Sequence, residues 1–177
     1  MSLMHIAVII CSTRPERVGD QVANWVFAQA KHPEAVFRVV DLKDYHLPNY
    51  GEVPNDKEKW DHRLAHFDGF IFVTPEYNHS ITGALKNALD ITREPLKNKA
   101  AAIVSYGSSG GVRAAEHLRQ ILAELEVADV RTNLTFSRQL DFEADTFKPN
   151  AKLEDLNLML AQLVSWAKAL KTIRKGV

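Results

Sequence analysis

The stretch Gly69-Phe-Ile-Phe-Val-Thr-Pro-Glu-Tyr-Asn-His-Ser-Ile-Thr-Gly83 decides the fold of this chain. Its first six residues form a dense apolar run, without the polar alternation of a strand that is half exposed. Such a run is typical of a strand in a parallel sheet that helices cover on both faces. The polar turn at 74–80 ends the strand, and the amphipathic pattern over 81–91 predicts the next helix.

The same alternation of strand, loop and helix extends along the rest of the chain. Apolar runs predict further strands at 4–10, 36–42, 100–105 and 127–132. Helical spacing of apolar residues predicts helices at 18–29, 58–66, 111–125 and 153–173. Residues 45–55 and 137–150 are expected to be polar connections. Five strands joined by right-handed crossovers predict a doubly wound α/β sheet.

Length and composition narrow the class of protein. The chain has 177 residues, which suits one domain, expected at 4–177, with Met1–Leu3 as a leader before a natural start at Met4. The 22 Lys and Arg balance the 22 Asp and Glu, which argues against a nucleic-acid partner. A single cysteine, Cys11, excludes an internal disulfide. Neither a signal peptide nor a membrane-length apolar run is present, so we expect a soluble, cytoplasmic protein.

Ligands of open α/β sheets bind beyond the carboxyl ends of the strands, and the first strand ends in an unusual loop, 11–20. Its hydroxyls, its arginines and the start of the next helix predict a phosphate site. A capped helix with solvated arginines explains the loop equally well. The loop matches neither the P-loop pattern nor G-x-G-x-x-G, so an ordinary Rossmann NAD site is disfavoured.

Two further strand ends carry loops of the same kind. The loop at 74–83 offers backbone N–H groups and Tyr77 to a flat heterocycle, although a simple turn with Ser80 capping the next helix is slightly favoured for it alone. The glycines of 105–113 let the backbone approach a ligand, although an empty flexible turn is equally compatible. Three such loops at successive strand ends make a shared ligand site much the stronger interpretation.

Together these segments resemble the NADPH-dependent FMN reductase family, a flavodoxin-like group that includes azoreductases and chromate or quinone reductases. The resemblance covers nearly the whole chain from Met4. It is carried by Ser-Thr-Arg-Pro-x-Arg-x-Gly at 12–19, by Thr-Pro-Glu-Tyr-Asn-His-Ser at 74–80 with Gly-Ala-Leu-Lys-Asn-Ala-Leu-Asp at 83–90, and by Ser-Tyr-Gly-x-x-Gly-Gly at 105–111. It implies a flavodoxin-like five-stranded parallel sheet in the order 2-1-3-4-5.

The resemblance also implies which residues bind FMN. The phosphate would be held by Ser12, Arg14, Arg17, Val18 and Gly19. The isoalloxazine ring would be lined, largely by backbone groups, by Pro75, Glu76, Tyr77 and Asn78. The far side of the ring would be closed by Ser105, Gly107 and Gly110. Two positions depart from the family pattern: Cys11 stands in place of Gly, and Thr82 in place of Pro. We expect Thr82 to reduce rigidity where the helix begins.

The implied reaction is ping-pong. NADPH or NADH gives a hydride to FMN and leaves, and a quinone, azo compound, metal ion or free flavin then takes the electrons. Because the cofactor supplies the chemistry, we assign no catalytic residue and no metal ligand. We expect His79 to be a bystander on an exposed loop and Cys11 to be a small buried residue.

The family resemblance implies a homodimer or homotetramer. Candidate interfaces are Leu47–Trp60 and the helix after Ile81, with Tyr50, Trp60 and Phe67 as anchors. For Trp60 and Phe67, packing in the core is an equal alternative.

A flavodoxin-type electron carrier and a non-catalytic FMN-binding module remain as alternative functions of the chain. The neutral charge and the missing Thr-x-Thr-Gly loop argue against a flavodoxin.

Overall fold

The computed structural model describes residues 3–52, 56–149 and 152–176. Within that part of the chain, six parallel strands form one sheet: β1 Met4–Ile10, β2 Ala35–Asp41, β3 Gly69–Pro75, β4 Lys99–Gly107, β5 Val127–Asp129 and β6 Leu134–Ser137. The order is β2-β1-β3-β4-β5, and β6 also pairs with β4. The predicted doubly wound α/β fold and its strand order are confirmed. Of the leader predicted at 1–3, only Leu3 lies within the described residues.

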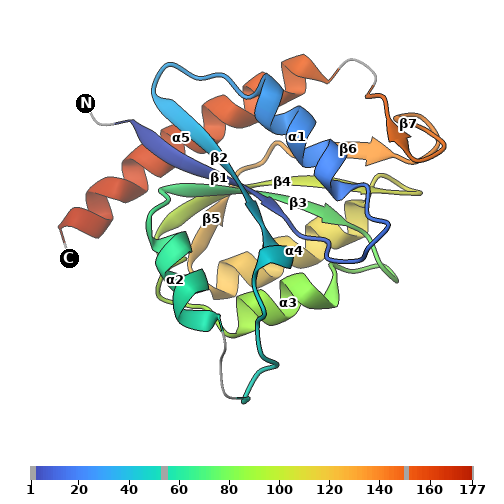
Figure 1. Ribbon diagram of the computed structural model, residues 1–177. Coiled ribbons are helices and arrows are strands. Elements are labelled where there is room, and N and C mark those ends of the chain that lie inside the picture. The colour runs from blue at the N-terminus through green and yellow to red at the C-terminus, as the bar shows by residue number, and fades with distance from the viewer. Residues whose placement is uncertain (1–2, 53–55, 150–151, 177) are drawn as a thin grey trace.

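Helices cover both faces of the sheet (Figure 1). They are α1 Gly19–Gln29, α2 Lys57–Ala65, α3 Gly83–Asp90, α4 Val112–Glu124 and α5 Leu153–Lys175, with a short 3-10 helix at Leu42–Asp44. One core cluster lies between the sheet and α1 and α5, and the other lies between the sheet and α2, α3 and α4. Every residue of β3 is buried, as its continuous apolar run predicts.

The far edge of the sheet differs from the prediction. The sequence predicts a single fifth strand at 127–132, but β5 ends at Asp129 and a separate strand, β6, pairs with β4 further along. The polar residues at 131–133 interrupt the apolar pattern between the two. The connection at 137–150 contains an antiparallel hairpin, β7 Phe142–Glu143 with β8 Thr146–Phe147. Strands of two residues are too short to produce a detectable period.

Two of the proposed interface anchors belong to the core. Trp60 and Phe67 are 1% and 3% exposed and pack with the cluster under α2, so the core alternative is correct for both. Tyr50 is 77% exposed, in a segment whose residues 53–55 lie outside the described part of the chain. Of the three, only Tyr50 lies on the surface, where it is accessible to a partner.

Candidate functional site

The three loops singled out in the sequence lie together at one edge of the sheet, beyond the carboxyl ends of β1, β3 and β4 (Figure 1). The N–H of Cys11 donates to Val73 O at 3.0 Å, and the N–H of Glu76 donates to Tyr106 O at 3.0 Å. The guanidinium of Arg14 lies 5.8 Å from the centre of the Tyr77 ring. The first loop therefore touches the second, and the second touches the third.

Where the first loop joins α1, the backbone of Gly19 packs closely against the side chains of Tyr106 and Ser12. Gly19, the first residue of α1, has no room for a side chain: a Cβ there would lie 2.4 Å from the hydroxyl oxygen of Tyr106 and 2.5 Å from Oγ of Ser12. Ser12 is fully buried and accepts a hydrogen bond from the Tyr106 hydroxyl at 3.3 Å. Burial raises the pKa of Tyr106, so its hydroxyl stays protonated and donates. No side chain caps the first turn of α1, which leaves its N–H groups to an anion.

The two arginines of this loop have different roles. Arg17 donates to Ser12 O at 2.8 Å and to both carboxylate oxygens of Asp41, and the hydrogen bond to Asp41 raises the pKa of Arg17. Its charge is therefore compensated, and it holds the loop against the end of β2. Arg14 is exposed and has no acidic partner among the described residues. Arg14 is the free cation of the loop.

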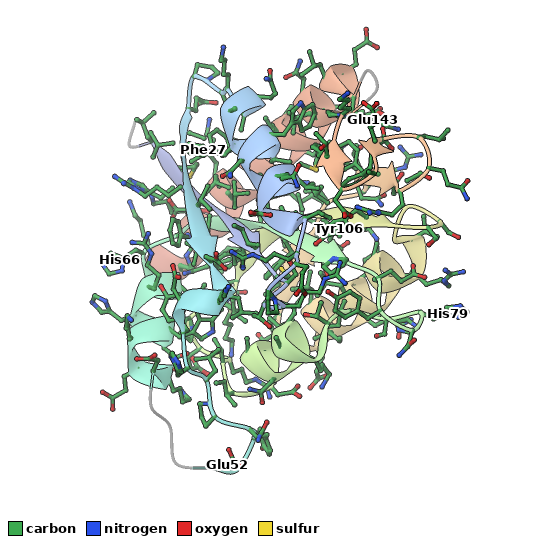
Figure 2. The ribbon with its side chains drawn as sticks, turned by 45° about the vertical axis from the view of Figure 1, so that its right-hand side comes forward. Phe27, Glu52, His66, His79, Tyr106 and Glu143 are labelled. Atoms are coloured by element: carbon green, nitrogen blue, oxygen red, sulfur yellow. The ribbon has the colours of Figure 1, made fainter. Side chains whose placement is uncertain are left out.

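The second loop contains a strained turn. Tyr77 and Ser80 exchange backbone hydrogen bonds of 2.9 and 3.0 Å, and the two residues between them, Asn78 and His79, have φ of 49° and 67°. A two-residue turn of this kind favours Asn followed by Gly, so a histidine there costs about 1 kcal/mol or more. Figure 2 shows His79 at the outer rim of the molecule. The turn presents Tyr77, 36% exposed, beside Arg14.

The third loop is closed by glycines. Gly110 and Gly111 both have φ of 73°, and a Cβ on Gly111 would lie 2.8 Å from Tyr106 N. Ser105 is fully buried, and its hydroxyl donates to Gly110 O at 2.8 Å. Only glycine adopts this backbone freely, so the loop folds back over the end of β4 without side chains to block access.

The side chain of Glu76 connects the second loop to the third, whereas the sequence pattern predicts mainly backbone contacts there. The carboxylate accepts hydrogen bonds from Arg113 N at 3.1 Å and from Arg113 Nε at 2.5 Å. The helix α4 begins after Gly111 without a side-chain cap of its own, so Glu76 caps it from another loop. Desolvation raises the pKa of Glu76, but the hydrogen bonds from Arg113 outweigh it and lower the pKa.

Thr82, and not Ser80, caps α3, so the prediction for Ser80 is wrong. The Thr82 hydroxyl accepts from Leu85 N at 3.0 Å and donates to Cys11 O at 2.7 Å. Oγ of Ser80 instead lies 3.0 Å from Nδ1 of His117. Thr82 therefore joins the start of α3 to the first loop, and the expected loss of rigidity is offset by this bond. Cys11 is fully buried, as predicted, and burial raises the pKa of its thiol.

The residues present fit the two ends of an FMN molecule. An exposed arginine, a buried serine hydroxyl and an uncapped helix start suit a phosphate group. Gly19 and Gly111, where an added Cβ would meet protein atoms within 3 Å, let the loops pack closely against one another at the ends of the strands. A metal fits less well, because no cluster of three His, Cys, Asp or Glu suited to a metal occurs in the described part of the chain. None of the helices described is both long and apolar enough to span a membrane.

A parallel sheet in the order 2-1-3-4-5, with an anion loop after β1 and a strained aromatic turn after β3, defines a flavodoxin-like protein. The chain belongs to the NADPH-dependent FMN reductase family, whose sequence profile matches residues 4–141.

Relatives support this assignment. An NAD(P)H-dependent FMN reductase of a Nectria species is 35% identical over 158 residues, covering 78% of this chain and 79% of the relative. A quinone reductase of Pseudomonas putida is 29% identical over 181 residues, covering 92% and 94%. The flavoenzyme NAD(P)H:(acceptor) oxidoreductase FerB of Paracoccus denitrificans superposes with a TM-score of 0.75 at 23% identity, covering 94% of this chain and 98% of that one, which shows the shared fold.

Proposed function

We propose that this protein is a reductase that binds FMN across the three loops and passes electrons from NADPH or NADH to a small-molecule acceptor such as a flavin or a quinone. The observation that most supports this proposal is that the three loops meet beyond the carboxyl ends of the strands. They bring together a free arginine, an uncapped helix start and a strained turn. The relatives named as FMN reductases and quinone reductases support the same reaction. When bound, FMN supplies the two-electron chemistry that couples the nucleotide to the acceptor.

The residues of the first loop bind and orient the phosphate in this proposal. Arg14 supplies the free positive charge, and Ser12, Val18 and Gly19 supply a hydroxyl and backbone N–H groups at the start of α1. Arg17 acts on the phosphate through the loop backbone that it holds, because Asp41 already occupies its guanidinium.

The other two loops orient the ring. Tyr77 and Asn78 present the strained turn, and Pro75 and Glu76 continue it toward the end of β3. From the opposite side, the ring is closed by Gly107 and Gly110, and the buried Ser105 holds Gly110 in place through its hydroxyl. Backbone N–H groups at such a position would donate hydrogen bonds to the ring and favour negative charge there. No side-chain acid or base is required, so His79 at the outer rim takes no part.

The assembly belongs to the same proposal. We infer that residues 4–177 act as one domain and that copies of the chain associate as a homodimer or homotetramer. The exposed Tyr50 and the exposed surface of α3 are the candidate contacts. A partner subunit on this side would help to enclose the acceptor.

The proposal is tested by steady-state oxidation of NADPH and NADH by the FMN-loaded protein, with menadione, an azo dye, chromate and free FMN as acceptors. We expect many turnovers with at least one acceptor and bleaching of the bound flavin by the nucleotide alone. A flavin that binds but stays oxidised after nucleotide is added indicates an electron carrier instead. A protein that remains colourless with excess FMN indicates a module without a working flavin site.

A further inference from the structure

A groove of about 820 Å³ lies between the edge strand β2 and helix α2, away from the three loops. Its charged and polar lining includes His5, Arg38, Lys59, His62, Arg63 and His66. Figure 2 places His66 on the opposite side of the molecule from His79, and in Figure 1 α2 lies far from the loop that joins β3 to α3. The groove is therefore distinct from the candidate flavin site, which it approaches at Asp41, the partner of Arg17.

The face of α2 that lines the groove is basic. Lys59, His62, Arg63 and His66 recur at intervals of three, four and seven residues, so they lie on one side of the helix. The core of the protein takes the other side, where Trp60 and Leu64 are buried. An amphipathic surface helix ordinarily turns mixed charges to solvent, whereas this one presents cations and imidazoles to a cavity.

The fixed positive charges of the groove lack acidic partners in the described part of the chain. The head group of Lys59 lies 5.1 Å from the Tyr45 ring centre, and that of Arg63 lies 5.4 Å from the Phe67 ring centre. Arg38 reaches the groove from β2. These aromatic contacts hold the cations in place without neutralising them.

The acidic residues of the groove do not balance these cations. Asp41 is bound by Arg17, which leaves Asp44 as the lining carboxylate that has no ion-pair partner among the described residues. Two arginines elsewhere in this neutral protein show the contrast, since Arg119 pairs with Asp129 and Arg138 with Asp145. The lining therefore carries an excess of positive charge that a bound anion would offset.

The imidazoles add hydrogen-bond donors to this charge. The rings of His62 and His66 pack edge to face with centres 4.5 Å apart, and His5 lines the groove from β1. A neutral imidazole donates one N–H and a protonated one donates two. Nδ1 of His66 lies 2.6 Å from His62 O, which only accepts, so a neutral His66 uses its N–H there and the donors for a ligand come from His5 and His62. A metal cation is disfavoured here, because three fixed cations share the lining.

We propose that this groove binds a small anionic ligand that carries a di- or triphosphate group. A single phosphate would fill little of the cavity, whose volume is in the usual range for sites of larger ligands. Arg38 and Arg63 approach from different elements, β2 and α2, so two guanidinium groups are available to successive phosphates in bidentate contacts. The site goes beyond the flavin chemistry, and its occupancy does not depend on that chemistry.

The test is a calorimetric titration with inorganic tripolyphosphate at low salt. The protein is first saturated with FMN, which blocks the phosphate loop. We expect one site, and we expect Arg38→Ala and Arg63→Ala each to weaken binding about tenfold or more. Arg131→Ala is the matched control, because Arg131 is an exposed arginine at the opposite edge of the sheet. Higher salt should weaken binding to the native groove.

Three results would overturn the proposal. The first is no binding, or equal losses in Arg131→Ala and the groove variants. The second is loss of tripolyphosphate binding in Arg14→Ala alone, which assigns the anion to the flavin loop. The third is orthophosphate binding as tightly as tripolyphosphate. Turnover of NADPH by Arg38→Ala should equal that of the unaltered protein, which separates this test from that of the reductase function.

Discussion

Glu76 shows how one side chain determines the arrangement of two loops. Its side chain is 7% exposed, and the carboxylate caps α4 and pairs with Arg113. We expect Glu76→Gln to lower the free energy of unfolding by about 1–2 kcal/mol, since the amide loses the charge that favours the helix start. FMN affinity should fall about tenfold because the second and third loops separate. Chemical denaturation and quenching of flavin fluorescence measure the two effects.

The matched control for Glu76 lies on the same helix. Glu116 is 70% exposed and pairs with Arg119 on the surface of α4. Glu116→Gln should change the stability by less than about 0.5 kcal/mol and leave FMN affinity unchanged. If the two variants behave alike, the capping role of Glu76 is incorrect.

Gly19 tests the close approach at the start of α1. A methyl group there meets the Tyr106 hydroxyl and Ser12, so Gly19→Ala should displace their hydrogen bond and weaken FMN binding about tenfold or more. Gly83 opens α3 with nothing within 4 Å of an added Cβ, which makes Gly83→Ala the control. That control should bind FMN normally and be equally or slightly more stable. Equal FMN affinity in the two variants would contradict this account.

Arg14 and Arg17 show that a residue pattern can locate charged side chains in a loop but cannot predict which of them is paired. The sequence places both in one loop beside a helix start, and nothing in their spacing distinguishes them. The structure separates them, because Asp41, at the end of β2, lies within hydrogen-bond distance of Arg17. A pairing partner 24 positions away leaves no periodic signal in the sequence.

At the scale of elements, Asp68 joins α5 to the sheet. It precedes β3 and accepts hydrogen bonds from Lys171 at 2.8 Å, Arg174 at 2.7 Å and the backbone N–H of His5 at 3.1 Å. Desolvation raises the pKa of Asp68, but the bonds from Lys171 and His5 outweigh it and lower the pKa. The last turns of the long helix are thereby tied to the starts of β1 and β3.

We expect Asp68→Asn to destabilise the protein by about 2–3 kcal/mol at neutral pH, since it leaves two cations without their partner. The native pKa lies below the unfolded value, so the contribution is present above about pH 4 and is lost as the pH falls through the native pKa. The difference in unfolding free energy between the two proteins should therefore shrink below about pH 4 in urea titrations.

A surface pair is the control for Asp68. Asp145 is 84% exposed and pairs with Arg138. Asp145→Asn should change stability by less than about 1 kcal/mol at any pH. A difference for Asp68→Asn that stays constant from pH 7 to pH 2 would contradict the assigned role.

Elements with long apolar runs were the most predictable. β3 was expected at 69–74 and is observed at Gly69–Pro75, and the last helix was expected at 153–173 and is observed at Leu153–Lys175. The β7–β8 hairpin was missed. It is stabilised by contacts among Phe142, Phe147 and Phe136, which lie on different elements and meet only after folding. Short strands held by distant aromatic residues have no local signature.

At the scale of the whole molecule, a ligand that bridges three loops should stabilise the native state. FMN at 100 times its Kd adds about 2.7 kcal/mol, which raises the Tm of a chain of this size by about 5–10 °C. Riboflavin, which lacks the phosphate, should produce a smaller shift because Arg14 and the start of α1 have no anion to bind. Scanning calorimetry measures both shifts. The absence of any shift with FMN would refute the site.

The sequence by itself determined the parallel sheet, its covering helices and the three loops at the strand ends, because burial on two faces requires continuous apolar strands and tight turns require particular residues. Only the tertiary structure decided which charges are free: Arg17 is neutralised by Asp41, Arg113 by Glu76, and the cations of the β2–α2 groove by no described residue. Charge pairing depends on distances in space between residues far apart in the chain. Hydrophobic periodicity carries no information about those distances.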